Sequence, residues 1–306
     1  MTQDNELSLH SRIKEIPRHL RNWIRWRFCP SGQFTLILTN DPDHSQAQNY
    51  RRVFDMLNKL NLKVTTAVFC TTEDDGSDLA KHCSRGETHT LEDPEYRELM
   101  IEQLKLGHEI AYHGYSQVSN TREKFVEGLE IFRETFGEYP FTYIEHGGHP
   151  DTHPPGMVKS ETLAKDGMNA KSSYYLLDIL QEKLKCVWAW HAHSLFDNDF
   201  QVKFPEDVFY EKHGVLFFKR CRMHYIDRMI SELPRKNGIF MGYTHFNGGP
   251  QGYPPTVDYR FENWTGHHLQ RVEKALTILL KRNNIRNMTI RELVEERNAR
   301  LTGDRK

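Results

Sequence analysis

The chain has 306 residues, and its 41 lysines and arginines almost balance its 42 aspartates and glutamates, for a formal net charge of −1. This balance argues against a nucleic-acid-binding protein, which usually has a basic excess, and 38% apolar residues argue against wholesale disorder. Five cysteines without a C-x-x-C pair, and a start that lacks an apolar signal stretch, favour a cytoplasmic location. The unusual figure is 17 histidines, because imidazole binds metals and titrates near neutral pH.

Residues 1–33 are predicted to form a basic, amphipathic N-terminal extension. Apolar residues recur at helical spacing from Ile13 to Ile24, and arginines and a lysine alternate with them, although Pro17 interrupts the pattern. Residues 12–27 could therefore contact an anionic membrane surface, which would place the protein at the inner face of the membrane. We favour the simpler interpretation, a terminal helix that packs on the main domain.

From residue 34 to residue 306 the pattern predicts one domain in which strands and helices alternate. Strands are expected at 34–39, 63–69, 109–112, 141–145, 169–173, 186–190, 215–218 and 239–243. Helices are expected near 50–60, 94–107, 120–136, 157–165 and 269–279, and after a capping box formed by Thr289 and Glu292. Asp93 with Pro94 and Asn120 with Glu123 are start signals, and Gly137 is a stop signal. Eight strands of this kind predict an α/β fold of the β/α barrel type, and an open doubly wound sheet is the alternative.

Acidic residues and histidines collect directly after the predicted strands. The residues in these positions are Asp41, Asp43, His113, Glu145, His146, His149, His191, His193 and His245. In a barrel, all of these positions project from one face, where the active sites of that architecture lie. Aspartate and histidine without clustered thiols suit Zn²⁺, with Co, Fe or Mn as alternatives. Such an ion lowers the pKa of water, and a free carboxylate and a histidine could then serve as general base and general acid.

The tripeptide Asp41-Pro42-Asp43 places two carboxylates at the end of the first strand. A period of two puts both side chains on the same side, so that one could bind a metal while the other stays free as the base. Taken alone, the tripeptide is better explained by an ordinary Asx-Pro turn that ends a strand.

Two strings together resemble the polysaccharide deacetylase family (NodB homology, carbohydrate esterase family 4). They are Thr39-Asn40-Asp41-Pro42-Asp43 and the segment 107–116, Gly-His-Glu-Ile-Ala-Tyr-His-Gly-Tyr-Ser. The order of the motifs covers roughly residues 34–295. The resemblance implies a distorted (β/α) barrel of seven or eight strands and metal-assisted removal of an acyl group from a sugar.

Carried over residue by residue, the resemblance implies that Asp41 is the general base, that Asp43 and His113 are metal ligands, and that His245 assists the leaving group. The family's second ligand histidine is replaced by Gln117, a poor zinc ligand. The family's Arg-Pro-Pro motif is replaced by Tyr-Ile-Glu-His-Gly-Gly-His at 143–149.

The replaced segment offers two histidines for the third ligand position. We expect His146 to be that ligand, because it lies nearest the strand end, and His149 is the alternative. The remaining candidates are assigned to substrate binding: Gln117, Glu145, His149, Tyr115, Trp190 and His191. Trp188 is a further aromatic residue that could stack on a sugar ring or belong to the core.

The function expected from these features is removal of an acetyl group from an amino sugar or glycan precursor. A lipid- or nucleotide-linked sugar made inside the cell fits the lack of a signal stretch. Two alternatives stay open. One is a deacetylase-like barrel that has lost catalysis and binds a glycan or a protein partner, and the other is a hydrolase of non-sugar amides.

Overall fold

The computed structural model describes residues 34–43, 45–72, 88–117, 121–146, 167–189, 208–222, 238–246, 267–282 and 285–302. The predicted N-terminal extension and the predicted helix at 157–165 lie outside these residues.

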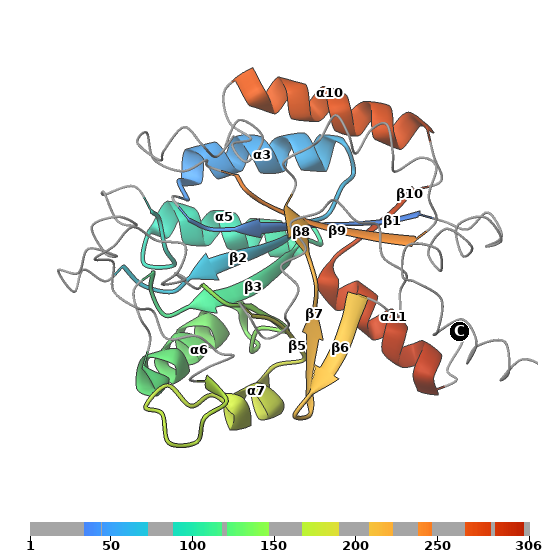
Figure 1. Ribbon diagram of the computed structural model, residues 1–306. Helices are drawn as coiled ribbons and strands as arrows, with labels where there is room; N and C mark the ends of the chain where they lie inside the picture. Colours follow the sequence, from blue (N-terminus) through green and yellow to red (C-terminus); the bar gives the residue numbers. More distant parts are fainter. Residues whose placement is uncertain are drawn as a thin grey trace, which may run out of the picture.

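The described strands form one sheet whose core is parallel (Figure 1). The strands are β1 (Phe34–Asp41), β2 (Thr65–Phe69), β3 (Glu109–Gly114), β4 (Thr142–Ile144), β5 (Cys186–Trp188), β6 (Phe209–Lys212), β7 (Val215–Phe218), β8 (Cys221–Arg222), β9 (Gly238–His245) and β10 (Ile285–Met288). They pair in the order β6-β7-β5-β4-β3-β2-β1-β9-β8, and β10 pairs with β1. Only β6 and β7 pair in the antiparallel sense among the described strands. The α/β fold of the distorted-barrel type is thus confirmed.

Helices follow most of the strands. They are α3 (Ala47–Lys59), α5 (Pro94–Lys105), α6 (Arg122–Phe136), α7 (Leu177–Lys183), α10 (His267–Arg282) and α11 (Ile290–Thr302). Figure 1 shows α3 and α10 along one side of the sheet and α6 and α7 at another. An outer core lies between the sheet and these helices, and it includes Leu36, Val53, Leu99, Leu129 and Leu276.

A second, inner core is built from the alternate residues of the same strands. Its members include Ile37, Ala67, Ala111, Ile144, Trp188, Phe218 and Met241, together with Ile290, Leu293 and Val294 of α11. Successive side chains of a strand point to opposite faces. Each strand therefore supplies one set of alternate residues to the outer core and the other set to the inner core. The residues that follow a strand in step with its inner-core set point toward the interior of the sheet.

Most local start and stop signals operate as the sequence predicted. The Asp93 side chain accepts a hydrogen bond from the backbone N–H of Tyr96 at the start of α5. Gly137 ends α6 with φ +82°. Thr289 and Glu292 form the reciprocal capping box, since each side chain accepts from the other residue's backbone N–H.

Two local predictions need correction. Helix α6 begins at Arg122, and its cap is Thr121 rather than Asn120, because the Thr121 side chain accepts from the backbone N–H of Lys124. Residues 169–173 form turns instead of a strand. There the Asn169 and Ser172 side chains accept backbone hydrogen bonds two residues ahead, which stabilises turns at the expense of a ladder.

Candidate metal centre and catalytic site

In four strands, the series of inward-pointing residues ends in a polar residue at the same edge of the sheet. Each polar residue lies two or four positions after an inner-core residue of its own strand. The pairs are Ile37 and Asp41, Ala111 and His113, Ile144 and His146, and Met241 and His245. Asp41 and His245 are register partners across β1 and β9. Because these strands are parallel, their carboxyl ends meet, and the polar side chains converge above the inner core.

A bulge in β3 places His113. Val68 pairs with Tyr112, but the next residue of β2, Phe69, pairs with Gly114, so His113 is the extra residue on β3. Gly114 has φ +139°, a conformation that residues with a side chain rarely adopt. Such bulges are common at the rims of barrels. The imidazole of His113, at this bulge, keeps the inward direction of Ala111 and is buried, 2% exposed.

Three imidazoles surround the carboxylate of Asp43. Its Oδ1 lies 3.8 Å from Nε2 of His113 and 3.6 Å from Nε2 of His146. Its Oδ2 lies 3.4 Å from Nε2 of His245. The ligand atoms of Asp43, His113 and His146 are all within 4.8 Å of one another. Two ligands of one tetrahedral zinc ion are about 3.3 Å apart at bond lengths of about 2.0–2.1 Å, so this group is close to coordination geometry.

The polar atoms of the group fit a cation. Oδ1 of Asp43 is buried and has no hydrogen-bond partner among the described residues, although it faces two imidazoles. Buried polar atoms normally have a partner. Burial alone would raise the pKa of Asp43, but His146, His113 and His245 hold this pKa well below its usual range. The carboxylate is therefore ionised at neutral pH, which is the state that binds a metal.

The second carboxylate, Asp41, is held by an arginine that sequence reasoning missed. Arg220 donates from Nη1 to Oδ1 of Asp41 at 2.5 Å and from Nη2 to Oδ2 at 2.8 Å. The arginine side chain is fully buried. Burial would raise the pKa of Asp41, but Arg220, His113 and His245 lower it overall. The bidentate pair fixes the plane of this carboxylate and keeps it ionised.

Two aromatic rings hold the guanidinium of Arg220. Its central carbon lies 3.8 Å from the ring centroid of Trp188 and 4.3 Å from that of Tyr243. Trp188 is only 5% exposed, so it packs on the arginine rather than offering a surface to a sugar. The sequence did contain one indication of this role. Arg220 lies two positions after the inner-core residue Phe218, so strand alternation directs its side chain to the same inner side.

The other predicted site residues follow the ends of β3 and β4 or lie outside the described chain. The buried Gln117 has an Nε2 atom without a partner in the described part of the chain. The Tyr115 hydroxyl donates to Glu127 of α6 at 3.5 Å. Glu145 is buried, and because it directly precedes His146, strand alternation directs its side chain to the opposite face. Predictions for His149, Trp190 and His191 concern residues that the structure does not describe.

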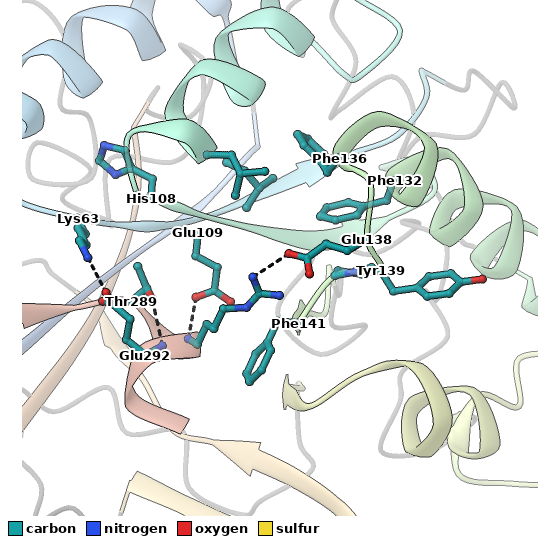
Figure 2. Close-up of a pocket in the computed structure, with 15 residues that line it drawn as sticks. Lys63, His108, Glu109, Phe132, Phe136, Glu138, Tyr139, Phe141, Thr289 and Glu292 are labelled. Carbon is teal, nitrogen blue, oxygen red and sulfur yellow. Dashed lines mark hydrogen bonds and ion pairs between the residues drawn. The ribbon is translucent and has the colours of Figure 1, made fainter. Parts of the chain in front are cut away.

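A cavity of about 240 Å³ lies at the opposite end of the sheet (Figure 2). It is lined by apolar residues such as Phe132 and Phe136, and by charged residues near the start of α11. Its charged groups are already paired: Lys63 with Glu292, and Arg291 with Glu138. Glu109 accepts from two threonine hydroxyls and from the backbone N–H of Arg291, so it anchors the start of α11. This cavity thus lies between structural elements whose charged groups are already paired, and the candidate metal ligands collect at the other end of the sheet.

Fold and site together define an α/β protein with an Asp-His-His group able to hold a metal ion beside a buried, ionised aspartate. No family model and no curated relative matches the chain. Solved structures similar to it include a family 4 acetyl xylan esterase from Clostridium thermocellum in complex with a cobalt ion. That match has 16% identity and a TM-score of 0.41, and it covers 86% of this chain and 92% of the other.

Two further solved structures are similar to the chain. One is a probable polysaccharide deacetylase from Pseudomonas aeruginosa PAO1, at 10% identity and TM-score 0.48, covering 86% of this chain and 90% of the other. The other is the Puue allantoinase, at 8% identity and TM-score 0.46, covering 88% and 92%. Within the described residues, no helix is both long and apolar enough to cross a membrane.

Proposed function

We propose that the protein is a metal-dependent hydrolase of the polysaccharide deacetylase type, which removes an acetyl group from an amino sugar or glycan precursor. The observation that carries the proposal is the arrangement around Asp43, whose two oxygens face three imidazoles at 3.4–3.8 Å beside the separate carboxylate Asp41. A purely structural cluster would bury hydrogen-bonded pairs, whereas Oδ1 of Asp43 lacks a partner among the described residues.

The proposed ligands are Asp43, His113 and His146, and zinc is the favoured ion, with cobalt, iron or manganese as alternatives. A divalent cation bound there would polarise the acyl carbonyl and make an attacking water more acidic. Three protein ligands leave positions for substrate, as in catalytic rather than structural zinc sites.

In this proposal Asp41 is the general base and Arg220 its positioning residue. A carboxylate has about four acceptor sites, so the bidentate arginine leaves Asp41 free to accept a proton from water. Its lowered pKa keeps it ionised at neutral pH. The pKa shift makes Asp41 a weak base, and a bound cation would offset this by making the attacking water more acidic.

His245 is proposed to donate a proton from its imidazole to the departing nitrogen. It occupies the register position opposite Asp41 on the neighbouring strand, so acid and base stand on adjacent strand ends. Tyr115, Gln117, Glu145, His149, Trp190 and His191 remain proposed substrate contacts. We extend the proposal to lipid- or nucleotide-linked sugars inside the cell, reached at the membrane face if residues 12–27 contact the bilayer.

The test measures acetate release from N-acetylglucosamine oligomers, acetylated xylan and a nucleotide-linked N-acetylamino sugar, with cyclic amides as the competing class. Asp41→Asn should lower kcat by about 10²–10⁴-fold, the usual contribution of a general base, while the bound metal stays stoichiometric. Asp43→Asn should lose the metal itself. Asp178→Asn is the matched control, because Asp178 pairs with Arg122 on the surface of α7.

The proposal is overturned if Asp41→Asn releases acetate as fast as the unchanged protein. Turnover of cyclic amides without any acetylated sugar would keep the hydrolase and replace its substrate class.

A further inference from the structure

Phe69 packs against both imidazoles that face Oδ1 of Asp43. Its ring centroid lies 4.9 Å from that of His113 and 5.1 Å from that of His146, with interplanar angles of 62° and 88°. The two imidazole centroids are 5.2 Å apart, so the three rings close a triangle. Phe69 is 1% exposed. An aromatic side chain thus forms the floor of the proposed metal site.

The backbone fixes the position of Phe69 from both sides. Phe69 is the last residue of β2, it follows the inner-core residue Ala67 by two, and it lies opposite the bulge that carries His113. Its carbonyl accepts from Leu91 at 3.1 Å. The next residue, Cys70, donates its N–H to the carbonyl of Tyr115 at 3.1 Å. The ring therefore sits on a stretch of chain tied to both neighbours.

The imidazole of His113 needs some contact to set its rotation. The torsion between an imidazole and its side-chain stem is broad and weakly restricted. In most metal sites the second ring nitrogen of a ligand histidine donates to a carboxylate or carbonyl, which fixes the ring. Nδ1 of His113 is buried but has no such partner in the part of the chain that the structure describes. The edge-to-face contact with Phe69 and the tilted contact with His146 therefore orient this ring, and Phe69 touches both imidazoles.

We propose that Phe69 is a positioning residue that holds His113 and His146 with Nε2 directed at Asp43, and so raises the affinity of the site for a divalent cation. The inference rests on the metal-binding role proposed above. Its physical basis is preorganisation: rings that are already fixed lose less conformational freedom when an ion binds. Phe69 does not touch the reacting atoms and acts only through the two histidines.

The experiment uses the full chain, stripped of metal by a chelator and then titrated with Zn²⁺ and with Co²⁺. Phe69→Leu keeps the site apolar but removes the aromatic edge. The dissociation constant for Zn²⁺, measured by competition with a chromophoric chelator, should rise by about 10–100-fold, the range found when groups that orient metal ligands are removed. The visible absorption band of the Co²⁺-loaded variant should also change in position or intensity, because the ligand geometry is less fixed.

Phe217→Leu is the matched control. Phe217 is equally buried on β7, but it belongs to the outer core, where it stacks on Tyr210. This variant should bind Zn²⁺ with unchanged affinity and give an unchanged Co²⁺ spectrum. Should Phe69→Leu fail to fold, Phe69→Met, whose unbranched side chain adapts better to an irregular space, takes its place with the same expectation.

The outcomes separate the two proposals. If the unchanged protein binds neither Zn²⁺ nor Co²⁺, the proposed metal-dependent function fails, and this inference fails with it. If the unchanged protein binds metal and the Phe69 variant matches Phe217→Leu in affinity and spectrum, only the positioning role is overturned.

Discussion

Replacing Arg220 by methionine should destabilise the protein strongly at neutral pH. The arginine is fully buried, makes two hydrogen bonds to Asp41, and lies over two aromatic rings. Methionine fills much of the same space but leaves the Asp41 carboxylate buried without its partner. Breaking a buried pair in this way costs about 3–5 kcal/mol, a large share of a typical unfolding free energy of about 5–15 kcal/mol.

The cost should depend on pH in a defined direction. In the unchanged protein the folded-state pKa of Asp41 is lowered, so the pair contributes stability above the unfolded-state pKa and loses it as the pH falls through the folded-state pKa. In Arg220→Met, burial outweighs the remaining influences and raises the pKa of Asp41. Acidification then protonates the Asp41 carboxyl, so the variant no longer buries an unpaired charge and is destabilised less. Between pH 8 and pH 5 only the effect on the variant operates, because the lowered pKa of Asp41 in the unchanged protein lies below this range, and the difference in stability between the two proteins shrinks as the pH falls.

The assay is urea unfolding of the metal-free proteins, with chelator present, at pH 8, 7, 6 and 5. The double variant Asp41→Asn with Arg220→Met removes both charges and should recover most of the lost stability, because a buried pair and a neutral replacement are often nearly equal in energy. A cost below about 1 kcal/mol, typical of exposed pairs, or a cost that is constant from pH 8 to pH 5, would refute the reasoning.

Three other substitutions test stability away from the site. The His108 imidazole accepts from the backbone N–H of Val64 and bonds to Asn58, and burial, with the nearby Lys63, lowers its pKa to about 4. A lowered histidine pKa destabilises the folded protein as the pH falls below the unfolded-state pKa of about 6.5, by about 2 kcal/mol at pH 5. In His108→Leu the free energy of unfolding, measured with chelator present, should lose this dependence on pH. An unchanged pH dependence would contradict the assignment. Gly137→Ala should cost about 1 kcal/mol, because φ is +82° but nothing lies within 4 Å of the added Cβ. Gly128→Ala should cost more, about 1–3 kcal/mol, because its Cβ would meet the Tyr112 hydroxyl at 2.2 Å; equal melting temperatures for the two glycine variants would count against this.

Much of the site was accessible from sequence because strand alternation is a local property. Asp41, His113, His146 and His245 each continue the inward phase of a strand whose apolar residues were already recognisable. The structure brings Asp43, His113 and His146 together as one group. Helix starts and stops were predictable for the same reason, since Asp93 and Gly137 act on backbone groups a few residues away.

Other features depended on contacts that no local pattern encodes. The predicted strand at 169–173 was wrong, because the side chains of Asn169 and Ser172 hydrogen-bond the backbone of their own turn. The bulge at His113 depends on how β3 pairs with β2, and neither strand specifies it alone.

By itself the sequence determined the alternating α/β pattern, the helix caps and the order in which carboxylates and imidazoles follow the strands. These depend on hydrogen bonds and burial within a few residues. Only the tertiary structure decided that Arg220 pairs with Asp41, 179 positions earlier in the chain, and that Phe69 lies under two imidazoles from other strands. Such contacts are set by strand order and register, because these bring distant segments within bonding distance.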